Sequence, residues 1–98
     1  MNISLDFETY SECDIFKAGA YAYADHETTK VLCMAYAIDE GQPRLWTPEM
    51  PPPTDLFNLI TGGATLWAWN SFFEMSIWSQ VLGWPEVPIS QWRDTAAL

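Results

Sequence analysis

The chain has 98 residues, of which 49% are hydrophobic and 17% charged, so the sequence predicts one small folded domain and excludes a disordered chain. Thirteen acidic residues against four basic ones give a formal net charge of −9. This charge excludes a protein that holds nucleic acid by a basic surface of its own. Either cations mediate any contact with phosphates, or the partner is not a nucleic acid.

The two cysteines and the apolar runs predict the compartment. Cys13 and Cys33 do not form a Cys-x-x-Cys pair, so the sequence indicates neither a zinc site nor a redox motif. No basic segment precedes a hydrophobic block, and no apolar run is long enough to span a membrane. We therefore expect a reduced, cytoplasmic protein with no membrane partner.

The first predicted element is a strand over residues 2–9, in which apolar and polar residues alternate. Asp6 and Glu8 lie two residues apart on it, so their carboxylates share one face and repel each other unless a proton or a cation lies between them. One interpretation is a solvated edge strand whose polar face carries the two acids. The other is half of a site for Mg²⁺ or Mn²⁺, which prefer carboxylate oxygens.

Residues 10–47 predict a hairpin after an irregular segment. Residues 10–30 show no clear pattern, apart from a helical turn over 14–18 that Gly19 ends. The apolar run over 31–38 is typical of a strand buried on both faces. A turn then leads to an antiparallel return strand over 44–47.

The second half predicts two helices around a further strand. After a proline-rich connector, Thr54 is expected to cap a helix that runs to Ile60 and ends at Gly62. Residues 64–69 predict a buried strand, and residues 70–82 a turn followed by a helix.

The end of the chain predicts a last strand over 89–93 and a helix over 95–98 capped by Asp94. Four residues are too few for a stable helix, so we expect a chain that is cut short. This order of elements predicts an α/β fold with a sheet of mixed direction, in a single domain over 1–98.

Glu74 is the second place where chemistry is expected, in the first turn of the helix after the buried strand. The local pattern Ser71-x-x-Glu74 favours a capping box, in which the Glu74 side chain returns to the backbone N–H of Ser71. The alternative is a metal ligand whose ionised form the helix dipole stabilises.

The order of the motifs resembles a known family. Asp6-Phe7-Glu8-Thr9, followed by Asn70-Ser71-Phe72-Phe73-Glu74, resembles the first two motifs of the DEDD-superfamily 3′–5′ exonucleases, which have a ribonuclease-H-like fold. The segments over 19–32, 35–39 and 93–98 are similar to exonuclease domains of phage-type family A DNA polymerases. The resemblance covers essentially the whole chain and implies the N-terminal portion of a proofreading domain, truncated before its C-terminal helices.

The resemblance also implies a site. Asp6 would bridge two Mg²⁺ or Mn²⁺ ions, Glu8 would bind the ion that activates water, and Glu74 would hold the second ion. The substrate would be the 3′ end of single-stranded DNA. The residues implied to contact it are Thr9, Asn70 and Phe72, with Tyr10 as a further stacking candidate.

The chain departs from the family at two points. It has Glu74 where the family usually has Asp, and it lacks the third motif, a Tyr or His followed four residues later by Asp. Tyr21 and Asp25 have that spacing but precede the second motif, in a segment expected to be a loop, and His26 is expected to have a local structural role.

Because of the missing motif we expect the isolated chain to be weakly active or inactive. The rest of a polymerase or a second protein chain is then a possible partner. The alternative function is a non-catalytic, acidic phage protein that keeps the fold in order to bind a protein, in the cytoplasm of the bacterial host.

Overall fold

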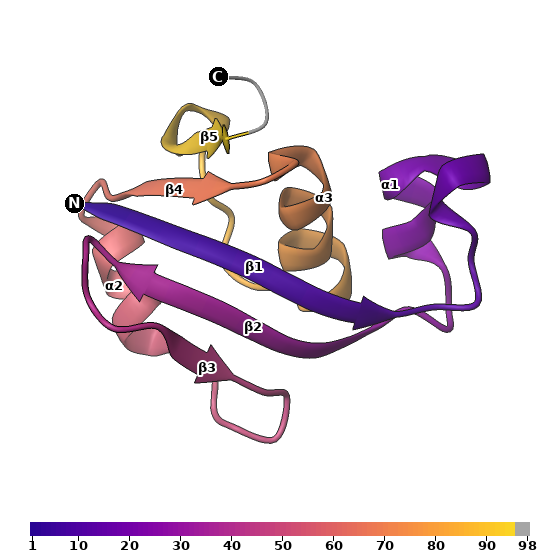
Figure 1. Cartoon of the computed structure of the whole chain (residues 1–98), viewed down its shortest axis with the longest axis horizontal. Helices are drawn as coiled ribbons and strands as arrows, with labels where there is room; N and C mark the ends of the chain where they lie inside the picture. The colour runs from indigo at the N-terminus through magenta and orange to yellow at the C-terminus, as the bar shows by residue number, and fades with distance from the viewer. Residues whose placement is uncertain (96–98) are drawn as a thin grey trace.

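A five-stranded mixed sheet forms the centre of the molecule (Figure 1), and the computed structural model describes residues 1–95. The strands lie in the order β3-β2-β1-β4-β5. Their bounds are Asn2–Tyr10 for β1, Lys30–Ile38 for β2, Arg44–Trp46 for β3, Thr65–Ala68 for β4 and Trp92–Asp94 for β5. The helices are α1 over Ile15–Asp25, α2 over Thr54–Thr61 and α3 over Ser71–Ser76, and α3 continues as the π-helical turn η1 over Ile77–Val81.

The alternating pattern near the start of the chain correctly predicts the strand β1, which lies in the middle of the sheet, so the interpretation as an edge strand is wrong. It pairs antiparallel with β2 along nearly its whole length, and parallel with β4 through residues 2–4 only. The side chains of Ile3, Leu5 and Phe7 are buried on one face. This mixed α/β arrangement is compatible with the ribonuclease-H-like fold expected from the sequence.

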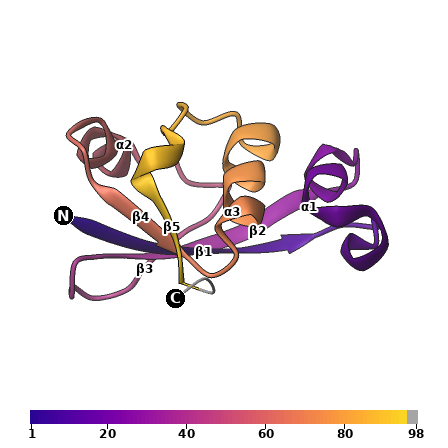
Figure 2. The ribbon, with the colours of Figure 1, turned by 90° about the horizontal axis from the view of Figure 1, so that it is seen from above.

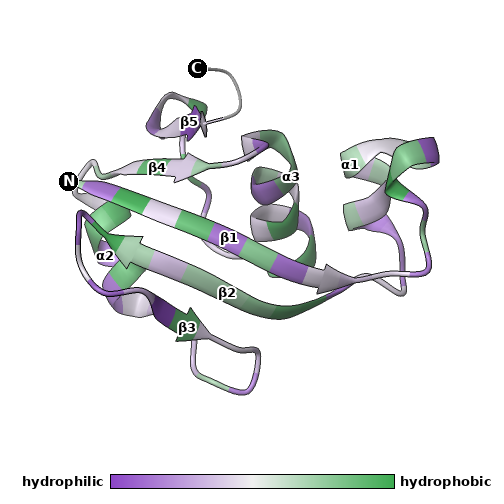
Figure 3. Cartoon of the chain, viewed as in Figure 1, coloured by the Kyte–Doolittle hydropathy of each residue, from purple (hydrophilic) through white to green (hydrophobic). Residues whose placement is uncertain are grey.

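The helices α2 and α3 lie on one face of the sheet, and α1 lies beyond the end of β1, where it packs against α3 (Figure 2). The prediction that residues 31–38 are buried on both faces is therefore wrong. Met34 and Tyr36 point to the helices and are buried, whereas Ala35 and Leu32 are exposed on β2, and Leu32 is 52% exposed. Figure 3 shows that apolar residues follow one another along most of β2.

An aromatic cluster fills the space between the sheet and the helices. Trp84 lies at its centre, with ring centroids 4.8 Å from those of both Trp46 and Trp78. Phe57 of α2 and Phe7 of β1 also pack against Trp84. Edge-on aromatic contacts add to the hydrophobic stabilisation from burial, so most of the tryptophans serve the core.

The first helix is longer than the sequence predicts. Asp14 caps α1 by accepting a hydrogen bond from the backbone N–H of Phe16 at 2.9 Å. Gly19 interrupts the helix, as expected, with a φ of 85°, but the chain resumes a helical path up to Asp25. The prediction of an irregular segment over 10–30 is wrong for the residues after Gly19.

The second helix lies where the sequence predicts it, but its first turn lacks the expected cap. Pro53 precedes it, and no side chain caps it, so the predicted Thr54 cap is wrong. Asp55 lies in the first turn and forms a salt bridge with Arg44 at 3.4 Å. The C-terminal end is at Gly62, whose N–H donates to the carbonyl of Asn58, as the glycine pair predicts.

The last described strand is shorter than predicted. Residues 89–91 form a 3-10 turn, and only 92–94 are in β5. The predicted helix over 95–98 lies largely outside the described residues. Cys13 and Cys33 are free, and among residues 1–95 no helix is long and apolar enough to cross a membrane.

Candidate functional site

The two acids of β1 lie on the uncovered face of the sheet. Asp6 and Glu8 are both exposed, opposite Ala35 and Cys33 of β2, while their neighbour Phe7 is buried on the helix side. The predicted shared face is therefore confirmed. Neither acid forms a salt bridge with a residue in the described part of the chain.

The third acid, Glu74, reaches β1 from the opposite side. Strand β4 pairs with β1 only as far as Ser4, so Phe7 lies beyond the part of β1 that β4 covers. The backbone N–H of Phe7 donates to Oε2 of Glu74 at 3.1 Å, in a buried environment. Without Glu74, this N–H would be a buried donor lacking a partner, which is a costly arrangement.

The surroundings of Glu74 favour its protonated form. The side chain is only 2% exposed. The pKa of Glu74 is raised from 4.5 to about 8, chiefly by burial. The negative charges of Asp6 and Glu8 contribute to this rise, and the hydrogen bond from Phe7 opposes it. The charges of Asp6 and Glu8 on β1 thus act on the carboxyl group of Glu74 on α3, and Glu74 is held in its neutral form.

The capping box predicted for Ser71 and Glu74 is wrong. Glu74 turns to Phe7 on β1, and the N–H of Ser71 donates instead to Oδ2 of Asp94 at 3.2 Å. A sequence pattern cannot distinguish these outcomes, because both satisfy the same backbone donor at the helix start.

Asp94 also binds the residue before α3. Its Oδ1 accepts from the N–H of Asn70 at 3.1 Å, and its Oδ2 accepts from the hydroxyl of Ser71 at 3.3 Å. The sequence predicted Asp94 as the cap of a following helix, whereas these hydrogen bonds go to the start of α3, at residues that precede Asp94 by 24 and 23 positions. The pairing of β4 with β5, in which Ala68 pairs with Asp94, brings the two segments together.

The residues expected to contact substrate lie in different environments. Phe72 and Tyr10 are 55% and 50% exposed, and Tyr10 has Lys30 over its ring at 5.5 Å. Asn70 adopts a left-handed conformation with a φ of 58°. The hydroxyl of Thr9 is engaged with the hydroxyl of Tyr23 at 2.9 Å, a contact that the sequence did not reveal.

The third-motif candidates lie in α1, not in the expected loop. Tyr21 and Asp25 are exposed within the second part of this helix. His26 ends α1, and its Nδ1 interacts with the hydroxyl of Thr28 at 2.7 Å, which agrees with the predicted local structural role.

The carboxylates fit a divalent cation by their chemistry but do not form a closed cage. Within residues 1–95, no three Asp, Glu, His or Cys side chains gather closely enough to be a ready metal site. Oxygen donors from Asp6, Glu8 and Glu74 are nevertheless the type that Mg²⁺ and Mn²⁺ prefer. A cation between them would offset the repulsion by Asp6 and Glu8, which adds to the effect of burial in raising the pKa of Glu74.

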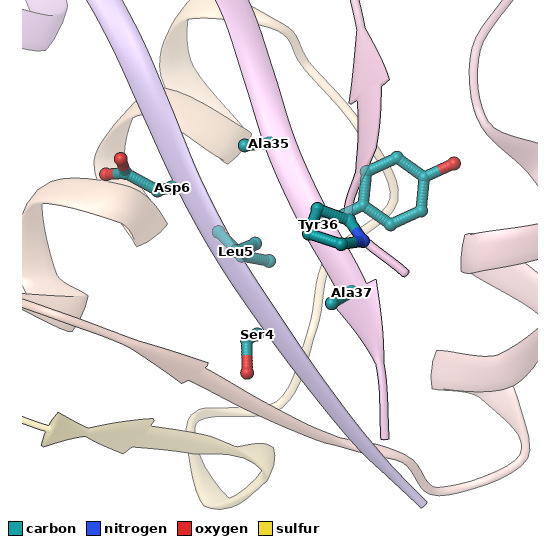
Figure 4. A pocket seen from close by; sticks show the side chains of 7 residues that line it. Ser4, Leu5, Asp6, Ala35, Tyr36 and Ala37 are labelled. Carbon is teal, nitrogen blue, oxygen red and sulfur yellow. The ribbon is translucent and has the colours of Figure 1, made fainter. Parts of the chain in front are cut away.

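A shallow hollow lies beside Asp6 on the uncovered face (Figure 4). Ser4 and Asp6 come from β1, and Ala35 and Ala37 from β2, where their small side chains leave space. Its full lining consists of Ser4, Leu5, Asp6, Ala35, Tyr36, Ala37 and Pro43. The hollow therefore places an apolar surface next to one of the candidate metal ligands.

Comparison with known proteins gives one informative similarity. No protein-family model matches the sequence, and no solved structure matches it. The chain is 32% identical over 97 residues to a DNA polymerase of Bacillus phage SP02. The alignment covers 96% of this chain but spans only 15% of the length of that polymerase. The chain is thus related to one segment of a phage DNA polymerase.

Proposed function

We propose that the chain is a metal-dependent 3′–5′ exonuclease domain of the kind that proofreads for a phage DNA polymerase. The observation that carries this proposal is the hydrogen bond from the backbone N–H of Phe7, which lies between Asp6 and Glu8 on β1, to the buried carboxyl group of Glu74 at 3.1 Å. The negative charges of Asp6 and Glu8 also act on this carboxyl group and contribute to its raised pKa. The similarity to part of a phage DNA polymerase supports the same function.

Asp6, Glu8 and Glu74 are the residues that would hold Mg²⁺ or Mn²⁺. When bound, such ions would activate water and offset the charge on the departing 3′ oxygen. Because a ligand carboxylate must be ionised, Glu74 has to give up its proton before it can serve. The affinity for the cation therefore rises with pH until the pKa of Glu74 is passed.

The 3′ end of single-stranded DNA is the proposed substrate. Exposed Phe72 follows directly after the start of α3, and the apolar hollow lies next to Asp6, so both offer surfaces for an unpaired base. The net charge of −9 repels a phosphate chain, so binding of DNA should depend on the divalent cation. A contact of substrate with Thr9 would compete with its hydrogen bond to Tyr23.

Mn²⁺ titration by calorimetry tests the proposal at the site itself. We expect Asp6→Asn and Glu8→Gln to lower the affinity at least ~10-fold, because each removes an anionic ligand. The matched control is Glu49→Gln, which removes the charge of an exposed acid in the loop after β3. Equal affinity in all four proteins would exclude a cation at Asp6 and Glu8.

The activity is tested with 5′-labelled single-stranded DNA, on which shortening from the 3′ end is followed with Mn²⁺ and with chelator. We expect weak digestion by the isolated chain that is abolished by chelation and by Asp6→Asn. Digestion that survives chelation would contradict a metal-dependent reaction and point to a contaminating nuclease.

The uncovered face of the sheet favours a second candidate function, that of a non-catalytic protein-binding domain. Leu45 is 59% exposed there and lies opposite Ala35, next to the hollow. Apolar surface of this kind is typical of protein contacts. Sedimentation would show association that Leu45→Lys weakens and that chelator leaves unchanged. A monomer at high concentration with normal stability would count against this function.

A further inference from the structure

The carboxylate of Asp94 connects the end of β5 to the start of α3. Oδ1 accepts a hydrogen bond from the N–H of Asn70 at 3.1 Å, and Oδ2 accepts from the N–H of Ser71 at 3.2 Å and from its hydroxyl at 3.3 Å. Two successive backbone donors and one side-chain donor thus converge on one carboxylate.

The start of α3 depends on this contact because its own sequence supplies no cap. Asn70 occupies the capping position in a left-handed conformation, with φ 58° and ψ 67°, and its side chain makes no capping hydrogen bond. Free N–H groups at a helix start need acceptors, and an anionic acceptor is favoured there. Asp94 provides it from a strand that is fixed in register, since Ala68 pairs with Asp94 in the parallel β4–β5 ladder.

The same short segment carries Glu74. Glu74 follows Ser71 by three residues, about one helical turn, and both side chains are buried. The direction in which α3 leaves Asn70 therefore sets where the Glu74 carboxyl meets β1, at the N–H of Phe7. A change in the anchoring of Asn70 and Ser71 must alter that contact, unless the rest of the core holds α3 in place by itself.

We propose that Asp94 is a positioning residue for the metal site: by anchoring Asn70 and Ser71 it places Glu74 opposite Asp6 and Glu8. This role rests on the proposed function, because it assigns Glu74 to the site that would hold the cation. It differs from that of an ordinary helix cap, which contributes to stability wherever the helix lies.

The experiment compares Asp94→Ala with a cap removed elsewhere. The matched control is Asp14→Ala, which deletes the side-chain cap of α1, a hydrogen bond of 2.9 Å to the N–H of Phe16. Both variants are expected to lose stability. Two further measurements distinguish them, namely the NMR shift and hydrogen exchange of the Phe7 amide without metal, and the Mn²⁺ affinity.

For Asp94→Ala we expect faster exchange and a shifted signal of the Phe7 amide, with Mn²⁺ affinity lowered ~10-fold or more, the usual size of effects from residues that support metal ligands. Asp94→Asn, which keeps one oxygen acceptor, should restore part of both. Asp14→Ala should leave both at the wild-type value. If Asp94→Ala does not fold, Asp94→Asn and Ser71→Ala carry the test through the same two measurements.

If the NMR shift and the hydrogen-exchange rate of the Phe7 amide are unchanged in the folded Asp94 variants, the proposal is overturned, because Glu74 would then be placed without Asp94. Loss of Mn²⁺ affinity to the same extent in Asp14→Ala also overturns it, since the effect would follow general stability. If the wild-type protein binds no Mn²⁺, the proposed function fails, and the Phe7 amide alone decides whether Asp94 positions Glu74.

Discussion

Glu74→Gln gives the sharpest test of the electrostatics at the site, because it removes the charge while keeping the shape of the side chain. The amide oxygen of glutamine can still accept the hydrogen bond from Phe7. The variant cannot ionise at any pH, so its stability lacks the contribution that depends on the Glu74 proton.

The expected magnitude follows from the pKa of Glu74, which rises from 4.5 to about 8 on folding. Below the lower pKa the group is neutral in both states, and the folded state carries no penalty. As the pH rises, the unfolded chain ionises first, so stability falls until the pKa of the folded state is passed. Between about pH 5 and about pH 8 the linkage relation gives a loss of about 3–4 kcal/mol for this group.

The assay is urea unfolding of wild type and Glu74→Gln at both pH values, in the presence of chelator. We expect the wild type to lose about 2–4 kcal/mol more than the variant between these pH values. Taking the difference between pH values cancels any constant cost of burying the glutamine amide. Glu49→Gln, at an exposed position, controls for the removal of one acid elsewhere. A difference below about 1 kcal/mol would show that Glu74 is already ionised in the folded protein and would refute the reasoning.

Two further predictions concern the fold. Leu66→Ala should lower the free energy of unfolding by about 2–5 kcal/mol, because Leu66 is fully buried. Leu45→Ala, at an exposed site, should change it little. Equal losses for the two variants in urea unfolding would contradict the assigned faces of the sheet. Gly19→Ala should cost about 1–3 kcal/mol, because φ 85° with ψ 168° is a backbone conformation that is essentially restricted to glycine. No atom lies near the added carbon, so the cost comes from the backbone alone, and Gly62→Ala, at a negative φ, should cost less. A neutral Gly19→Ala in urea unfolding would show that α1 has no such residue at this position.

The sequence predicted those elements whose signal is local. The alternation over 2–9, the apolar run over 31–38 and the return strand after it all appear as strands. These patterns indicate which side chains are buried. Because successive side chains of a strand point to opposite faces, the spacing of the apolar residues is enough to identify the strand. The sequence predicted a layer on both faces of β2, but the second face has none (Figure 2). An apolar run is compatible with either arrangement, so it cannot show whether a second layer covers the strand.

The candidate site likewise has one part that the local sequence predicts and another that depends on contacts between distant residues. That Asp6 and Glu8 share a face follows from the period of a strand and is confirmed. The partner of Glu74 could not be predicted, because Phe7 is 67 residues away and the contact exists only where β4 stops pairing with β1. The role of Asp94 was missed for a similar reason, since a cap supplied by another strand leaves no signature near the helix that it caps.

The position of β1 in the middle of the sheet has a consequence for folding during synthesis. β1 finds its antiparallel partner β2 within the next thirty residues, so this hairpin can form early. The other edge pairs with Thr65–Trp67, more than sixty residues later, and β5 follows only after that. Until β4 has emerged from the ribosome, the nascent hairpin presents an open strand edge and the apolar side chains Ile3, Leu5 and Phe7. Such an intermediate is prone to pair with other chains.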